Sequence, residues 1–369
     1  MKFLKKIMIP LLIATGLIGA TTLFVIHQPP FGGKPTKEQL LRYRKSPNYK
    51  DGKFHNLVET PVMAPEASYI DLLRQQLAGG ESRAPQEAIL VVKRNMKETP
   101  SSGNPHLTWF GHSSYLLQLS GYNLLVDPVF SERTSPFDFV GTKAFAGTTE
   151  IGVEDLPAID FVLITHDHYD HLDYPTIQKL AHKAKGFYVP LGVGAHLERW
   201  GVSSDQIHEL DWWEEIPLVA DLQLIATPAR HFSGRGITDR NKTLWASYVL
   251  KSKQHSLYLG GDSGYGPHFK EIGNLFGPFD LTLLECGQYH PYWPNIHMMP
   301  EETVQAHLDL KGKVLMPVHW GKFTLSLHAW NEPVERVTAK AKEKGVTVVT
   351  PRIGEQVVVD SKLPVKPWW

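Results

Sequence analysis

The chain contains a single cysteine, Cys286, among its 369 residues. One cysteine cannot form an intrachain disulfide, so its presence neither demands nor excludes an oxidising compartment. Cys286 follows the apolar run 281–284, a position typical of a small, buried core residue. A thiol nucleophile is the alternative interpretation.

The chain also lacks net charge, because 38 lysines and arginines balance 38 aspartates and glutamates. It has no stripe of basic residues of the kind that binds nucleic-acid phosphates. The composition therefore argues against a nucleic-acid partner. The length suffices for one large catalytic body with an N-terminal extension.

The N-terminus carries an apolar run that is about long enough to cross a bilayer. Lys2, Lys5 and Lys6 precede residues 7–26, which are almost wholly apolar. No A-x-A cleavage site or lipobox cysteine follows, which favours a retained anchor over a cleavable signal peptide. We therefore predict a transmembrane anchor or signal segment over residues 1–28, with the catalytic domain outside the cytoplasm.

Residues 29–104 are predicted to form a linker and N-terminal extension. The segment opens on Pro-Pro-Phe-Gly-Gly and stays polar, with further proline and glycine breaks. One amphipathic helix is expected over residues 68–77. We expect this region to wrap the catalytic domain or to shape the mouth of its site.

The catalytic domain is predicted to span residues 105–369, where strand-like runs alternate with helical segments. The runs 107–119 and 122–126 indicate a hairpin that turns at Ser120-Gly121. Helices are expected over residues 175–185, 196–200, 268–275, 300–310 and 333–344.

The most informative stretch is residues 165–173, Thr-His-Asp-His-Tyr-Asp-His-Leu-Asp, which directly follows an apolar run typical of a buried strand. Since side chains alternate along a strand, His166 and His168 leave its end on the same side. Asp170 and His171 follow in the turn. The segment can therefore offer imidazoles to one divalent metal and a carboxylate plus an imidazole to a second.

Three further candidate ligands each follow an apolar run and have glycine or proline close by in the sequence. They are His231 after residues 222–226, Asp262 in Gly-Gly-Asp-Ser-Gly, and His319 in Pro-Val-His-Trp-Gly. Polar residues at the ends of several strands converge in α/β sheets. Alone, each would be more typical of a satisfied polar group; together with the first motif they predict one site.

In this order the motifs resemble the metallo-β-lactamase superfamily, and most closely the bacterial branch of the N-acylphosphatidylethanolamine phospholipase D-like family. The likeness covers about residues 105–355, and its supporting segments are 109–113, 126–131, 165–173, 209–214, 261–265, 277–280, 297–302 and 319–321. The resemblance implies the α/β (α+β) class and a four-layer αββα sandwich of the metallo-β-lactamase type.

The resemblance also implies two zinc ions, with other divalent metals such as Mn²⁺ or Fe²⁺ as alternatives. One ion would be held by His166, His168 and His231, the other by Asp170, His171 and His319, with Asp262 as the bridge. Paired cations lower the pKa of bound water and stabilise the charge that develops when a phosphodiester is attacked.

His297 is the third candidate catalytic residue, beside Asp170 and Asp262. The family places this position next to the metals, so the histidine would contact substrate or protonate the leaving group. The alternative is a structural role where the next helix begins. Asp167 and Asp173 are candidates to orient ligand imidazoles.

Candidate substrate-binding residues are Asp138, Phe139, Tyr292 and Trp293. The first two stand where the animal enzymes of the family lead one to expect a Gln-Tyr pair, and this departure bears on which lipid is accepted. The aromatic pair would form an interfacial surface for lipid, with ordinary core packing as the alternative.

We predict a binuclear zinc-dependent hydrolase, foremost a phosphodiesterase of phospholipase D type acting on N-acylphosphatidylethanolamine or a related glycerophospholipid. The alternatives are a metallo-hydrolase of another ester, lactone or phosphodiester, and a non-catalytic membrane-tethered metal-binding protein. The complete set of seven ligands argues against the last. Expected partners are the phospholipid or another small-molecule substrate, the membrane and, as a possible homodimer, a second copy of the chain.

Overall fold

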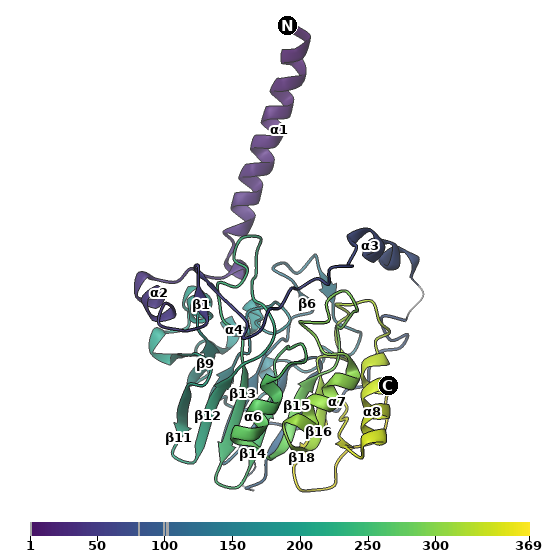
Figure 1. Ribbon diagram of the computed structural model, residues 1–369. Helices are drawn as coiled ribbons and strands as arrows, with labels where there is room; N and C mark the ends of the chain where they lie inside the picture. Colours follow the sequence, from purple (N-terminus) through teal and green to yellow (C-terminus); the bar gives the residue numbers. More distant parts are fainter. Residues whose placement is uncertain (1, 80–81, 99, 101–102) are drawn as a thin grey trace.

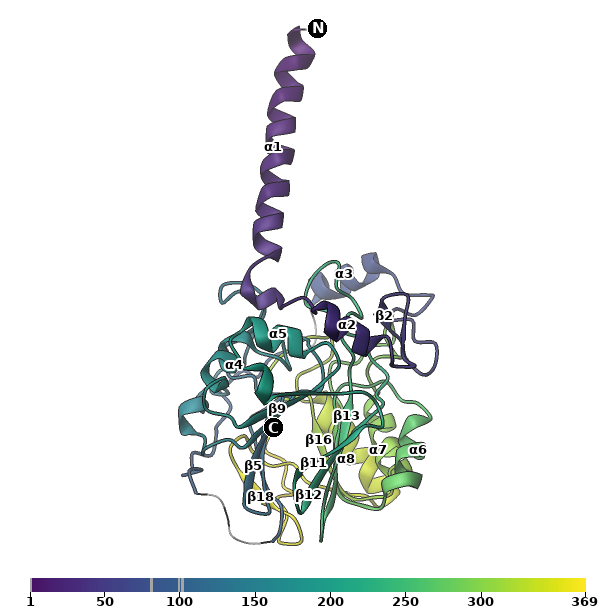
Figure 2. The ribbon, with the colours of Figure 1, turned by 90° about the vertical axis from the view of Figure 1, so that its left-hand side faces the viewer.

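The computed structural model describes residues 2–79, 82–98, 100 and 103–369. Two seven-stranded sheets face each other in the body, and helices cover their outer faces (Figure 1, and turned by 90° in Figure 2). This arrangement is a four-layer αββα sandwich, so the predicted fold class is confirmed.

The first sheet has the strand order β10-β9-β8-β5-β4-β3-β18. Its strands are β3 (His106–Trp109), β4 (Tyr115–Leu119), β5 (Tyr122–Val126), β8 (Phe161–Leu163), β9 (Gly186–Pro190), β10 (Ile207–Leu210) and β18 (Gln356–Val358). The four neighbours β5, β8, β9 and β10 run parallel. Their carboxyl ends therefore meet at one edge, where sites form in sheets of this kind.

The second sheet has the strand order β11-β12-β13-β14-β15-β16-β17. Its strands are β11 (Glu215–Val219), β12 (Leu222–Thr227), β13 (Ser247–Ser252), β14 (Ser256–Leu259), β15 (Phe279–Glu285), β16 (Gly312–Val318) and β17 (Thr347–Val348). Strands β14 to β17 are parallel to one another. Cys286, which directly follows β15, is fully buried in the core, as predicted.

Alternating side chains divide the core into layers. On β5, Leu124 joins the core cluster between the sheets, whereas Leu125 joins the cluster under the outer helices. The outer helices are α4 (Tyr174–Leu180), α5 (Gly194–Arg199), α6 (His268–Phe276), α7 (Pro300–Asp309) and α8 (Glu332–Lys344). All five lie where the sequence predicted helices, with ends that differ by a few residues.

The N-terminal region adds α1 (Lys2–Ile26), η1 (Pro29–Phe31), α2 (Lys37–Tyr43), β1 (Tyr49–Lys50), β2 (Lys53–Phe54) and α3 (Tyr69–Ala78). Short elements elsewhere are β6 (Arg133–Thr134), β7 (Thr142–Lys143), η2 (Val153–Asp155) and η3 (Ser204–Gln206). Helix α1 projects from one end of the body (Figure 1). Within the described part of the chain, no helix combines the length and the apolar character that crossing a bilayer requires. The predicted single-pass anchor is therefore not supported.

The extension between α1 and the body is tied to the body by hydrogen bonds. The side chain of Asn56 pairs with both backbone groups of His231, at 2.7 and 3.1 Å. Further along, the backbone N–H of Ala64 donates to the carbonyl of Tyr292 at 2.8 Å. The extension thus runs past a predicted metal ligand, where the sequence led us to expect it to shape the mouth of the site.

The predicted strand over residues 107–119 is interrupted. It forms β3 and β4, joined by a tight turn in which Gly111 and His112 have φ angles of 85° and 52°. Such left-handed backbone is rare for a residue other than glycine and is common at functional sites. The turn brings His112 to the edge of the sheet where the carboxyl end of β5 lies.

A fully buried amine leads to a prediction about the pH dependence of stability. The Nζ of Lys322 donates to the carbonyl oxygens of Val129 and Phe110, at 2.8 and 3.4 Å. Burial lowers the pKa of Lys322 from 10.5 to about 8. Between these two values the unfolded chain holds the proton more tightly than the folded chain, so stability rises with pH. This contribution amounts to at most about 3 kcal/mol.

The variant Lys322→Met is expected to lack this rise. The free energy of unfolding of both proteins is measured by urea unfolding at pH 8 and at pH 10. The change between the two pH values in the wild type minus the change in the variant gives the contribution of Lys322. Other titrating groups cancel in that difference. Equal changes in the two proteins would contradict the prediction.

Candidate metal centre

The seven predicted ligands lie together at the edge where the carboxyl ends of the parallel strands meet. His166, His168, Asp170 and His171 follow β8, and His231, Asp262 and His319 follow β12, β14 and β16. Their ligand atoms form overlapping groups, each with all atoms within 4.8 Å of one another. The structure thus brings together side chains that are spread over 154 positions of sequence, from residue 166 to residue 319.

Asp262 stands between two sets of histidines. Its Oδ2 lies 3.9 Å from Nε2 of His166 and 3.8 Å from Nε2 of His231. Its Oδ1 lies 3.2 Å from Nε2 of His171 and 3.1 Å from Nδ1 of His319. Each carboxylate oxygen therefore faces a different pair of imidazoles, as a carboxylate shared by two cations requires.

Unsatisfied atoms in this cluster fit a bound cation. Nε2 of His171 and Oδ1 of Asp262 are buried and make no hydrogen bond with any residue that the structure describes. Buried polar atoms almost always have partners, so an unpartnered nitrogen and oxygen facing each other indicate a missing positive charge. Imidazoles and carboxylates are the ligands that zinc, manganese and iron accept in proteins.

Burial keeps most of these imidazoles neutral, which is the form that binds a metal. It lowers the pKa of His166 and His319 well below the usual value, and that of His168 to about 4. For His171, burial also acts to lower the pKa, but neighbouring carboxylates, led by Asp262, raise it well above the usual value. Burial raises the pKa of Asp262 itself to about 6, against the opposing effect of His171. The carboxylates around His171 therefore favour positive charge at the point where they converge, as a bound cation would supply.

Asp127 positions His171, one of the candidate ligands, a role that the sequence did not reveal. Its Oδ2 lies 2.7 Å from Nδ1 of His171 and accepts a 2.6 Å hydrogen bond from Oγ1 of Thr165. Asp127 follows β5 directly, so the strand-end argument used for the other ligands would have selected it. The two aspartates that we expected to orient ligand imidazoles have other partners. Asp167 binds Thr243, Gly234 and His196, which is not a predicted ligand, and Asp173 binds Thr176 and Ser131.

Replacing Asp127 by asparagine is expected to weaken metal binding by about 10- to 100-fold, because the imidazole of His171 loses its charged partner. Competition with a coloured chelator measures the affinity. Asp160→Asn is a suitable control, since Asp160 is also buried but lies before β8, at the opposite end of the strand. An affinity equal to that of the wild type would contradict this role.

His297 lies beside the ligands and pairs with an acid that the sequence did not single out. Its Nδ1 is 2.8 Å from Oε2 of Glu285, the last residue of β15. Oε1 of Glu285 accepts the backbone N–H of Ser263 at 2.8 Å, which fixes the carboxyl group. Burial raises the pKa of Glu285 well above its usual value and lowers that of His297. The pair is therefore suited to hold one exchangeable proton next to the cluster.

His112 is a further buried neighbour that we did not predict as part of the site. Its Nε2 lies 2.9 Å from Oδ2 of Asp170, and its ring is 4.1 Å from that of His319. It shares one group of four possible ligands with Asp170, His171 and His319. The contact fixes the orientation of the Asp170 carboxylate.

The predicted substrate residues are divided between several places. Trp293 lines the metal pocket, a hollow of about 310 Å³ that also touches Val62 and Met63 of the extension. The backbone carbonyl of Tyr292 accepts a hydrogen bond from Ala64 of the extension. Asp138 lines a different hollow, next to Pro30, and Phe139 is 73% exposed. Of the four, only Trp293 lies with the candidate metal ligands.

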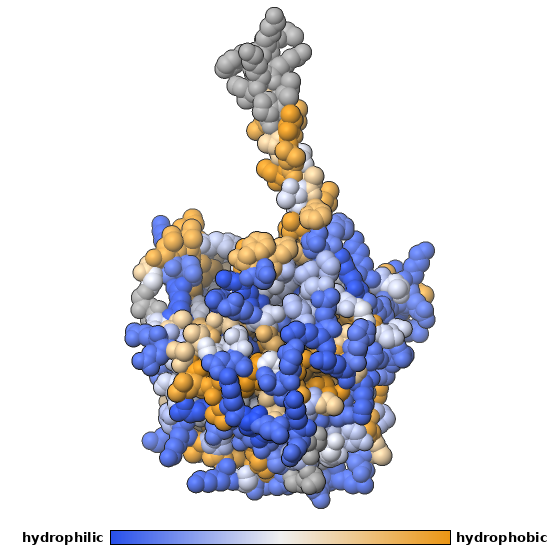
Figure 3. Space-filling model, turned by 180° about the vertical axis from the view of Figure 1, so that it is seen from behind, coloured by the Kyte–Doolittle hydropathy of each residue, from blue (hydrophilic) through white to orange (hydrophobic). Residues whose placement is uncertain are grey.

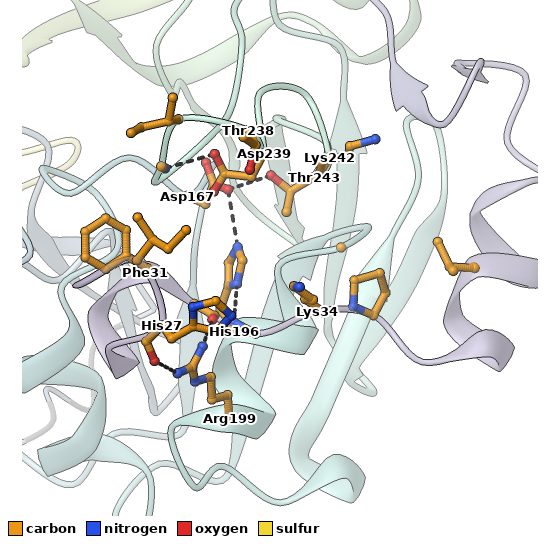
Figure 4. A pocket seen from close by; sticks show the side chains of 18 of the residues that line it. His27, Phe31, Lys34, Asp167, His196, Arg199, Thr238, Asp239, Lys242 and Thr243 are labelled. Atoms are coloured by element: carbon orange, nitrogen blue, oxygen red, sulfur yellow. Dashed lines mark hydrogen bonds and ion pairs between the residues drawn. The ribbon is translucent and has the colours of Figure 1, made fainter. Parts of the chain in front are cut away.

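A larger cavity of about 610 Å³ lies below the end of α1 (Figure 4). In it, His196 links the N-terminal segment to the body, because its Nδ1 accepts the backbone N–H of Gly33 at 2.9 Å and its Nε2 lies 3.3 Å from Asp167. None of the seven predicted ligands lines this cavity. The candidate metal ligands therefore lie at the smaller pocket.

Comparisons with known proteins agree with this site. Residues 122–320 match the family described as a beta-lactamase superfamily domain. An uncharacterized protein of Mycobacterium tuberculosis is 44% identical over 330 residues, 88% of each chain. An N-acyl-phosphatidylethanolamine-hydrolyzing phospholipase D of Caenorhabditis elegans is 31% identical over 67% of this chain and 74% of its own.

Among solved structures, a metallo hydrolase of the archaeon Ignicoccus hospitalis superposes with a TM-score of 0.55 and 22% identity, over 70% of this chain and all of its own. At that identity the likeness concerns the fold alone. The family match covers more than half of the chain, and the cluster contains the ligand types that a metal-dependent hydrolase needs. The chain therefore belongs to the metallo-β-lactamase superfamily of metal-dependent hydrolases.

Proposed function

We propose that the protein is a binuclear, zinc-dependent phosphodiesterase of phospholipase D type, acting on N-acylphosphatidylethanolamine or a related glycerophospholipid. The observation that carries the proposal is Asp262, whose two oxygens face two separate sets of imidazoles. Two cations a few ångström apart suit a phosphodiester, because both the attacking and the leaving oxygen gain from nearby positive charge.

The relatives support the choice of substrate class. The Caenorhabditis elegans relative and a mitochondrial relative of Saccharomyces cerevisiae, 31% identical over 303 residues, are both named as hydrolysing N-acyl-phosphatidylethanolamine. The metal pocket is also lined by the apolar side chains of Val62, Met63, Ile296 and Leu325. Such a mouth favours an amphiphile over a sugar or nucleotide phosphodiester.

The residues of the chain would divide the work. His166, His168 and His231 would hold one ion and Asp170, His171 and His319 the other, with Asp262 between them. Zinc bound there would supply hydroxide at neutral pH and stabilise the negative charge on the phosphoryl oxygens. Nδ1 of His297 is held by Glu285, so Nε2 is the nitrogen left to protonate the leaving alkoxide. The products would be a phosphatidic acid, which gains the oxygen of water, and an alcohol.

The test is a product analysis on the metal-loaded protein. We expect incubation with a panel of phospholipids and lactones to release phosphatidic acid and the headgroup alcohol, identified by mass. In ¹⁸O-water the label should enter the phosphate. Hydrolysis of a lactone with all phospholipids left intact, or release of diacylglycerol, would contradict the proposal.

A further inference from the structure

Exposed apolar side chains gather at the end of the body from which α1 departs. Seen from behind, hydrophobic residues follow the rim of that end (Figure 3). Beside the base of α1, Phe139 is 73% and Ile237 82% exposed. Phe139 stacks on Phe137, which contacts Phe31 directly after α1, at ring distances of 5.4 and 6.1 Å. Such clusters usually mark a surface that contacts another body.

Helix α3 contributes a second part of this surface. Figures 1 and 2 both place it at the same end as the base of α1. Tyr69, Ile70, Leu73 and Leu77 are 58–77% exposed, and their spacing puts them on one side of the helix. Arg74 turns instead to an ion pair with Asp71, at 3.1 Å. None of the residues of α3 is buried, so packing against the body does not explain its apolar side.

The same helix borders a route to the metal pocket. Leu72 and Leu73 line a hollow of about 630 Å³ whose other wall includes Trp293 and Leu325. Trp293 and Leu325 also line the metal pocket. The two hollows therefore share a wall, and a long apolar chain lying along α3 would end beside the metal ligands.

Helix α1 distinguishes between the possible occupants of this surface. Leu11, Leu12 and Ile13 are consecutive and are each 57–65% exposed, and Leu17 and Ile18 are 62% and 67% exposed. Consecutive helical positions point in directions about 100° apart, so the exposed apolar surface extends around α1. The face of one protein partner covers one side of a helix and would leave the rest of this apolar surface exposed, whereas a lipid interface can take up apolar side chains on several sides of a helix that lies in it.

We propose that this end of the molecule docks on a phospholipid bilayer, with α3 lying in the interface and its apolar side among the lipid chains. The juxtaposition of α3, the 139 and 237 loops and the shared wall at Trp293 carries the inference. Helix α3 would lie on the membrane rather than cross it. The biological meaning of this docking rests on the proposed function, because docking would present the lipid at the mouth of the metal pocket.

The test places a single fluorescent probe on the full-length, metal-loaded protein. Leu77→Cys and, separately, Ile237→Cys are labelled with an environment-sensitive dye, which Cys286 does not take up because it is buried. Vesicles of phosphatidylcholine and phosphatidylethanolamine are then added. We expect a blue shift at both positions, and quenching of both dyes by lipids brominated on their acyl chains.

Leu275→Cys on α6, which is also an exposed leucine at 59%, is the matched control and is expected to show neither effect. Unchanged emission at Leu77, or an equal response at Leu275, would overturn the proposal. A shift at Leu77 that appears with rising protein concentration in the absence of vesicles would assign the surface to a second copy and would also overturn it. Because docking is read without turnover, a vesicle response without phospholipid hydrolysis would refute the proposed substrate and support the docking surface.

Discussion

Replacing Asp262 by alanine is expected to remove bound metal and to lower phosphodiester hydrolysis by at least about 10³-fold. The reason is geometric, since Asp262 faces both sets of imidazoles, within 3.1 to 3.9 Å. The measurements are metal content by elemental analysis after dialysis and turnover of a soluble bis-aryl phosphodiester.

The variant should still fold. In the metal-free protein Asp262 is a buried acid whose pKa burial raises to about 6, so its charged form costs free energy. Asp221→Ala is a matched control, because Asp221 is exposed and pairs with Lys253 at the surface. Near wild-type turnover in Asp262→Ala, with two metals retained, would refute the bridging role and with it the proposed mechanism.

Replacing His297 by alanine is expected to lower turnover of an alkyl phosphodiester by about 10²- to 10⁴-fold while both metals stay bound. An alkoxide is a poor leaving group and needs a proton, which the pair of His297 and Glu285 is placed to supply. A p-nitrophenolate leaves without one. The loss should therefore be much smaller with bis(p-nitrophenyl) phosphate.

This leaving-group dependence separates a proton donor from a structural residue. A misfolded or metal-poor variant would lose both activities in equal measure. His182→Ala, at an exposed position after α4, is the control and should leave both rates unchanged. Equal losses on the two substrates would reject the role as proton donor, and a loss of bound metal would make His297 a ligand.

Local sequence carried much of the information about this site. Residues 165–173 combine a strand end with closely spaced imidazoles and carboxylates, so short-range geometry sufficed to propose ligands there. His231, Asp262 and His319 were recognised because each follows a predicted strand, and parallel strands bring their carboxyl ends together. The same reasoning applies to Asp127 and Glu285. Asp127 lies in one of the segments that carry the family resemblance, but the pattern gave neither acid a role that distinguishes it from an ordinary polar residue.

Other assignments needed distances that no sequence pattern contains. Asp138 and Phe139 stand next to each other in sequence, yet their loop lies beside the base of α1 and not among the residues that line the metal pocket. Conversely, Val62 and Met63 belong to a polar, proline-rich extension and nevertheless line the same pocket as candidate metal ligands. The order of residues does not specify which loop crosses above which strand.

By itself, the sequence determined the alternation of strands and helices and the ligand types, because hydrophobic periodicity and short metal motifs act over a few residues; the layered αββα architecture was what the family resemblance implied. Tertiary structure alone decided that Asp127 holds His171, that Glu285 holds His297, and that the apolar side of α3 adjoins the metal pocket. The first contact joins residues that are 44 positions apart in the sequence, the second joins residues 12 positions apart, and the third joins residues more than 200 positions apart. They depend on how two sheets and the N-terminal extension pack, and packing is a property of the whole chain.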